Sequence, residues 1–148
     1  MKRFKIDNFI KTHPGEPFPW FRTLTDEECQ ELRERLAARL SLSRDVSRLD
    51  LVRAVHSTAV VIRNADAMVA GFDVAALMHT QGFNVREYVW INWYRFDKVD
   101  QMCLDKFSQH FDDIWYPGPD DIELFDNSLE WMIEIMHDGQ ISILRFEE

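Results

Sequence analysis

Apolar residues recur at helical spacing in the first third of the chain. The positions on this face are Cys29, Leu32, Leu36 and Leu40. Their spacing of three or four residues is that of one side of an α-helix. Thr25 followed by Glu28 is the capping-box pattern that begins a helix. We therefore predict a helix over residues 25–41.

The stretch that follows has a weaker pattern. Ser47 and Asp50 form a second helix-start signal. Residues 60–62, Val-Val-Ile, suit either the continuation of that helix or a short buried strand, and both alternatives remain open. Asp73 is a further N-cap residue and predicts a short helix after it.

Strand patterns dominate the rest of the chain. Residues 86–96 are β-branched and aromatic on both faces, which predicts a central strand. Residues 121–125 predict another strand. Between the two, Asp97 is expected to cap a helix over residues 98–109.

Asp138-Gly139 is the strongest short-range hairpin signal in the chain. A two-residue turn there pairs His137 with Gln140. The expected partners are then Trp131 with Phe146, Ile133 with Leu144, and Ile135 with Ser142. This register places the large apolar groups on one face of the hairpin.

Together these elements predict one α+β domain over residues 1–148, with N-terminal helices packed on a C-terminal antiparallel sheet of about four strands. Residues 1–23 contain three closely spaced prolines, so we expect an extended, Pro-rich arm there. Residues 24–84 are expected to be mainly helical. Residues 85–148 are expected to be β-rich with one helix.

The composition of the chain indicates the cellular compartment in which the protein acts. The N-terminus has no apolar run of signal-peptide length, and no segment is long and apolar enough to span a membrane. Cys29 and Cys103 are the two cysteines, and they form no C-x-x-C pair. We therefore expect a cytoplasmic protein with reduced thiols and no membrane partner.

The charge is strongly uneven along the chain. Residues 107–144, here called the acidic segment, hold nine acids and no lysine or arginine, whereas the whole chain has 26 acids and 17 bases. Residues 33–63 are instead rich in arginine. The two segments either face each other in the fold or form separate surfaces. The net charge of −9 argues against nucleic acid and favours a basic protein as the partner.

Aromatic residues and a stiff loop lie inside the acidic segment. Residues 112–121 contain Trp115, Tyr116, two prolines, a glycine and four aspartates. Trp and Tyr are frequent interface anchors, and a stiff loop lowers the ordering cost of binding. The predicted partner-binding residues are Asp112, Asp113, Trp115, Tyr116, Asp120, Asp121, Glu123 and Asp126. The alternative is that Trp115 fills the core and the aspartates only solvate a loop.

No strong catalytic pattern accompanies these residues. His110, Asp112 and Asp113 are close in sequence, but no EF-hand loop or H-E-x-x-H motif is present. Pro119-Asp120 and Glu123 resemble the start of a nuclease motif that then lacks its lysine. We predict no catalytic residue, no metal site and no cofactor. The competing hypotheses are a metal-assisted hydrolase that uses the carboxylates of residues 110–123, and a subunit of a homo-oligomer.

One resemblance adds to this interpretation. The runs over residues 91–97, 111–117, 120–126 and 131–139 resemble the C-terminal half of small bacterial toxin-immunity proteins, including those of contact-dependent growth inhibition. The resemblance covers about residues 88–146 and carries no catalytic signature. It implies a protein that binds and blocks a cognate toxin domain, for example a nuclease, in the cytoplasm. Electrostatic complementarity to a basic toxin would speed that association.

Overall fold

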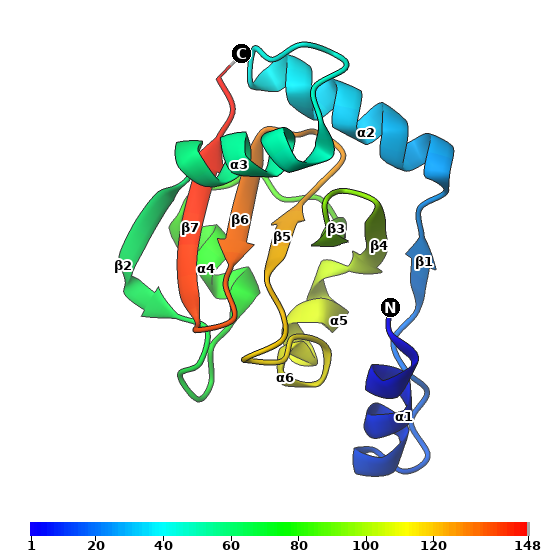
Figure 1. Ribbon diagram of the computed structural model, residues 1–148. Coiled ribbons are helices and arrows are strands. Elements are labelled where there is room, and N and C mark those ends of the chain that lie inside the picture. Colours follow the sequence, from blue (N-terminus) through cyan, green and yellow to red (C-terminus); the bar gives the residue numbers. More distant parts are fainter. Residues whose placement is uncertain (148) are drawn as a thin grey trace.

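A computed structural model describes residues 1–147 and shows an antiparallel sheet of seven strands in the order β1-β4-β3-β5-β6-β7-β2 (Figure 1). The strands are β1 (Phe21–Thr23), β2 (Val60–Asp66), β3 (Tyr88–Tyr94), β4 (Lys98–Cys103), β5 (Ile122–Phe125), β6 (Trp131–Ile135) and β7 (Gln140–Arg145). The helices are α1 (Arg3–Thr12), α2 (Asp26–Arg39), α3 (Arg48–Thr58), α4 (Val74–Thr80), α5 (Leu104–Gln109) and α6 (Phe111–Ile114). The α+β class is confirmed, and the sheet is larger than the four strands expected.

Helices cover both faces of the sheet. In Figure 1, α3 crosses one end of β6 and β7 in front of the sheet, and α4 lies behind it. Phe125 and Met132 pack with α2 and α3, whereas Ile133 and Trp131 pack with α4, α5 and α6. Helices cover both faces of β5 and β6, so these strands are buried along their whole length and carry apolar side chains on both faces.

No helix among residues 1–147 is long and apolar enough to cross a membrane.

The predicted helix over residues 25–41 is confirmed as α2, and so is its local start signal. Thr25 Oγ1 accepts a hydrogen bond from Glu28 N at 3.1 Å, and Glu28 Oε2 accepts one from Thr25 N at 2.7 Å. Ser47 and Asp73 likewise accept hydrogen bonds from the first turns of α3 and α4. Residues 60–62 belong to a strand and not to a helix, but β2 is an exposed edge strand and not a buried one.

The arm expected over residues 1–23 is wrong for its first half, because residues 3–12 form α1. Lys5 and Phe9 are buried one helical turn apart and hold α1 against the rest of the molecule. The three prolines lie in the following segment without regular structure, and β1 comes after it.

The helix expected over residues 98–109 is also wrong in its first half. Residues 98–103 form β4, which pairs with both β3 and β1, and the helix α5 begins only at Leu104. Asp97 therefore does not cap a helix, and its Oδ1 accepts from Arg33 and Arg48. Val99, Asp100 and Met102 are fully buried in this strand.

The β6–β7 hairpin is confirmed, but its register differs by one residue from the prediction. Trp131 pairs with Arg145, Ile133 with Ile143, and Ile135 with Ile141. The turn has three residues, His137, Asp138 and Gly139, closed by a hydrogen bond from Met136 N to Gln140 O at 2.9 Å. Only Gly139 among them has a positive φ, of 90°. The turn therefore fits a three-residue loop that ends in a left-handed glycine, and not a two-residue type I′ turn.

Gly139→Ala is expected to lower the free energy of unfolding by about 1–3 kcal/mol, because alanine strains a left-handed position. A Cβ at Gly139 would also overlap Asp66 Oδ1 and approach Met68 N to 3.1 Å. Gly118→Ala is the matched control, since Gly118 has a φ of 96° and open space around its Cβ. Urea denaturation should show the larger loss for Gly139→Ala, and equal losses would contradict the packing of Asp66 against this turn.

Candidate functional site

The structure buries four of the eight residues predicted to bind a partner. Trp115, Asp120, Glu123 and Asp126 are at most 9% exposed. Trp115 Nε1 donates to Asp120 O at 3.1 Å, and the Asp120 carboxylate accepts from buried Lys5 and from Tyr116 N. These residues are therefore not available to a partner in the folded chain, and the core position of Trp115 corrects the predicted surface.

Two further members of the predicted set are only partly accessible. Asp113 Oδ2 lies 2.9 Å from His13 Nε2. The ring of Tyr116 is half-buried, and Lys5 Nζ lies 4.0 Å from its centroid. Asp112 and Asp121 are exposed. A partner surface in the acidic segment has to be built around residues such as these two, together with neighbours that the sequence analysis did not select.

The fold places other acids beside Asp121, around the turn between β6 and β7. Asp121 Oδ1 accepts from His137 N at 2.7 Å and lies 2.9 Å from His137 Nδ1. On the other side of the turn, Ala67 N donates to Gly139 O at 3.0 Å, which brings Asp66 alongside. Three exposed acids, Asp66, Asp121 and Asp138, therefore surround one turn although they are far apart in sequence.

Exposed apolar side chains adjoin these acids. Met68 is 56% exposed and Val69 is 60% exposed, directly after Asp66. The surface formed by Asp66, Met68, Val69, Asp121, His137 and Asp138 is here called the turn surface. It continues into β2, an edge strand on which Val60 is 65% exposed. Acids next to accessible apolar groups are suited to binding a basic protein surface.

The imidazole of His137 is part of the turn surface. Its hydrogen bond to Asp121 and the charge of that carboxylate raise the pKa of His137 above its ordinary value. Protonated His137 would offset part of the negative charge of the turn surface. The turn surface should therefore be more negative at pH 8 than at pH 6.

The arginine-rich segment does not neutralise these acids. Among residues 1–147, no arginine between positions 33 and 63 forms an ion pair with an acid of the acidic segment. Arg33 and Arg48 bind Asp97, Arg44 binds Glu34, and Arg53 binds Asp50. The two segments are nevertheless in contact, since Arg35 donates to Asn127 O and Oδ1 and Arg39 donates to Ser128 O, so they face each other through polar groups and not through these ion pairs.

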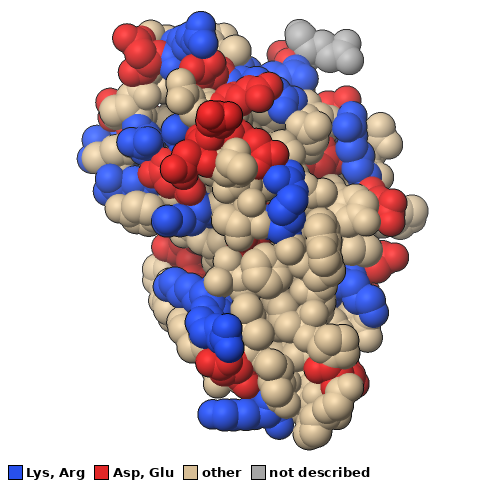
Figure 2. All heavy atoms as spheres, turned by 90° about the vertical axis from the view of Figure 1, so that its right-hand side faces the viewer, with Lys and Arg blue, Asp and Glu red and all other residues tan. Residues whose placement is uncertain are grey.

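The face of the molecule that carries α2 and β1 has a different character. Basic and acidic side chains alternate over its upper part, and uncharged atoms cover much of the rest (Figure 2). A cavity of about 540 Å³ opens on the sheet beside α2, and it contains both Arg22 and Glu28, whose side chains pair at 2.8 Å. Charges of both signs therefore line this cavity, unlike the turn surface, where acids predominate.

A row of polar residues crosses the centre of the sheet. Asn92, Glu123, Glu134 and Ser142 are register partners on β3, β5, β6 and β7, and all are at most 9% exposed. Asn92 Nδ2 donates to Glu123 Oε2 at 2.7 Å, and His56 Nδ1 of α3 lies 3.4 Å from Glu134 Oε2. Glu134 Oε1 has no hydrogen-bond partner among residues 1–147.

Burial dominates the protonation of this row. Desolvation, reinforced by the charge of Glu134, raises the pKa of Glu123 to about 8. Desolvation also raises the pKa of Glu134, although His56 opposes it. Glu123 is therefore largely uncharged at neutral pH. Glu123 was among the predicted partner-binding residues, but Asn92, Glu134 and Ser142 were not. The signal for them is the presence of polar residues within strand patterns that are otherwise apolar.

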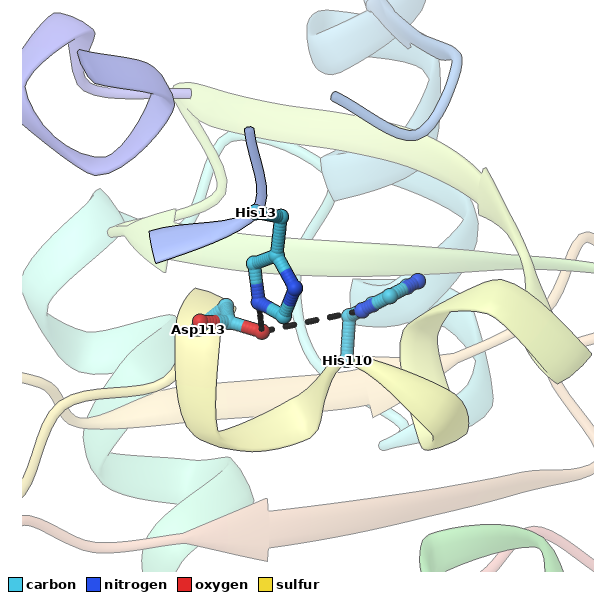
Figure 3. Close-up of side chains that lie close together, drawn as sticks. All are labelled: His13, His110 and Asp113. Carbon is cyan, nitrogen blue, oxygen red and sulfur yellow. Dashed lines mark hydrogen bonds and ion pairs between the residues drawn. The ribbon is translucent and has the colours of Figure 1, made fainter. Parts of the chain in front are cut away.

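One group of side chains among residues 1–147 has the composition of a transition-metal site. His13, His110 and Asp113 come from the end of α1, the junction of α5 and α6, and α6 itself (Figure 3). Their potential ligand atoms all lie within 4.8 Å of one another. His110 and Asp113 are close in sequence, whereas His13 is about 100 residues away and joins them only in the folded chain.

Comparisons of the chain with protein-family models, with curated proteins and with solved structures find no match.

Proposed function

We propose that this chain is a non-enzymatic binding protein that neutralises a basic protein domain, in the manner of a toxin-immunity protein. The observation that carries the proposal is the convergence of Asp66, Asp121 and Asp138 around one turn, next to exposed Met68 and Val69. The turn surface takes the place of the original set of eight residues. Asp121 is the member of that set that belongs to the turn surface.

The charge distribution supports a protein partner over nucleic acid. The acidic segment has no lysine or arginine of its own, and Arg33 and Arg48 of the arginine-rich segment bind Asp97. Phosphate contacts need accessible cations, and the turn surface contains no lysine or arginine. A basic toxin domain, for example one that itself holds nucleic acid, has the complementary charge. The free thiols of Cys29 and Cys103 are compatible with the cytoplasm, where such a toxin would act.

Neutralising the turn surface is expected to slow association with the partner. The variant combines Asp66→Asn, Asp121→Asn and Asp138→Asn, which preserves hydrogen-bond acceptors at all three positions. The probe is the polypeptide encoded immediately upstream, since toxin and immunity proteins are expected as neighbours. We expect the association rate at low salt to fall roughly 10-fold or more, and the difference to shrink as salt screens the charges.

The matched control combines Glu16→Gln, Glu31→Gln and Asp105→Asn, three exposed acids outside the acidic segment. It changes the net charge equally but leaves the turn surface intact. Stopped-flow or surface-based kinetics at two salt concentrations would compare the variants. Equal association rates for both would exclude the turn surface as the binding site. No binding of the wild-type chain at either salt concentration would remove the proposed immunity function.

A further inference from the structure

The three side chains of Figure 3 have contacts typical of a preformed metal site. His13 Nε2 lies 2.9 Å from Asp113 Oδ2, and His110 Nδ1 lies 3.6 Å from the same oxygen. Zinc bonds to imidazole nitrogen and carboxylate oxygen are about 2.0–2.2 Å long, so ligand atoms around a tetrahedral ion lie roughly 3–3.5 Å apart. Small side-chain movements would therefore bring these atoms into bonding positions.

Packing already holds the two imidazoles in place. Phe9 of α1 stacks on the His13 ring at 4.4 Å and meets the His110 ring edge-on at 5.1 Å. Hydrogen bonds also hold the backbone that bears these side chains. His13 N donates to Phe9 O at 2.8 Å, and Asp113 N donates to His110 O at 3.0 Å. Rings that are ordered before binding lose less entropy when an ion arrives.

The site is half-buried and still accessible. The exposed fractions of the side chains are 31% for His13, 11% for His110 and 26% for Asp113. Three protein ligands leave a fourth tetrahedral position for water or a further ligand, as in open zinc sites. Two imidazoles favour zinc and its first-row neighbours over Mg²⁺ and Ca²⁺, which prefer all-oxygen ligands.

We propose that His13, His110 and Asp113 bind one divalent transition-metal ion of the zinc type. The ion links the end of α1 to α6, two elements that are about 100 residues apart and already in contact. Binding of the ion therefore closes the long loop of chain between His13 and His110, and it stabilises the docking of α1 on the rest of the molecule. The site is separate from the turn surface and does not depend on the proposed neutralising function.

The test is calorimetric titration of the metal-free chain with Zn²⁺ and, separately, with Mg²⁺, together with thermal melts. We expect one Zn²⁺ per chain and a Tm increase of roughly 5–10 °C when free Zn²⁺ is about 100 times the dissociation constant. Mg²⁺ should produce neither effect. Hydrogen exchange should slow in α1 on addition of Zn²⁺, a readout that zinc bound elsewhere would not affect.

Three single variants, His13→Asn, His110→Asn and Asp113→Asn, should each weaken Zn²⁺ binding at least 10-fold. The control combines His56→Asn, His79→Asn and His137→Asn, which removes the other three histidines and should retain the ion. The Tm response to Zn²⁺ is compared within each variant, so a general loss of stability does not affect the result. Co²⁺ should also give the visible absorption of a tetrahedral site in the wild-type chain and in the control.

Three results would overturn the proposal. The first is an absence of Zn²⁺ binding by the wild-type chain. The second is binding that the control variant loses and His13→Asn retains. The third is stoichiometric binding with no change in the hydrogen exchange of α1. In any of these cases His13 and Asp113 form only a hydrogen bond.

Discussion

Lys5→Ala is expected to lower the free energy of unfolding by about 3–5 kcal/mol, the usual cost of leaving one partner of a buried ion pair alone. The side chain of Lys5 is 0% exposed and binds the carboxylate of Asp120, which is 5% exposed. Its Nζ also donates to Ile114 O at 2.6 Å and lies 4.9 Å from the centroid of the Trp93 ring. The substitution would leave the Asp120 carboxylate buried without its cation.

Lys11→Ala is the control for this prediction, because Lys11 lies on the same helix and is exposed. Its effect should stay within about 0.5 kcal/mol. Urea denaturation followed by circular dichroism measures both variants. A loss below about 1 kcal/mol for Lys5→Ala would contradict the buried position of this side chain.

A double-mutant cycle would isolate the ion pair from the rest of the packing. Lys5→Met retains the length of the apolar chain, and Asp120→Asn retains an acceptor for Tyr116 N. Each single variant leaves a buried partner without its counter-charge, whereas the double variant removes both charges. The double variant should therefore be more stable than the sum of the single losses implies.

The second large effect concerns the pH dependence of stability through Glu123. Burial raises the pKa of Glu123 from 4.5 to about 8 in the folded chain. Between these two values the folded state holds a proton that the unfolded chain has released. The contribution of Glu123 to stability is therefore full below about pH 4.5 and decreases as the pH rises to about 8. The slope reaches at most about 1.4 kcal/mol per pH unit.

Glu123→Gln removes this titration and retains an acceptor for Asn92 Nδ2. The stability of the wild type minus that of the variant should decrease between pH 5 and pH 8, so the variant gains relative stability in alkali. Denaturant titrations at one-unit intervals of pH would measure this difference. The exposed neighbour Glu130 serves as a control through Glu130→Gln, which should follow the wild-type profile. A difference curve that does not change with pH would mean that Glu123 stays ionised in the folded chain.

Local signals explain what could be predicted for the fold. Thr25 and Glu28 are three residues apart and form hydrogen bonds with each other's backbone, so the sequence alone predicts the start of α2 correctly. The same holds for the cap of α4 at Asp73 and for the aromatic strand β3, whose composition suits a position buried on both faces. Asp138-Gly139 identified the hairpin, but the choice between a two-residue and a three-residue turn shifted its register.

Contacts between distant segments explain what could not be predicted. α1 is stabilised because Lys5 binds Asp120, a partner 115 residues away, and nothing in the first 12 residues indicates that contact. Residues 98–103 form a strand because β1 and β3 lie on either side of them. Local helix propensity is a weak signal that such tertiary pairing can override.

For the candidate sites, the sequence by itself determined the charge and the types of side chain, and the tertiary structure decided which of them are accessible and which lie together. The lack of lysine and arginine in the acidic segment is a property of the sequence alone. The burial of Trp115, the approach of Asp66 to Gly139, and the approach of His13 to Asp113 follow only from the folded chain. The physical reason is that hydrogen bonding within a turn acts over a few residues, whereas burial and side-chain clustering depend on the whole sheet and the helices that cover it.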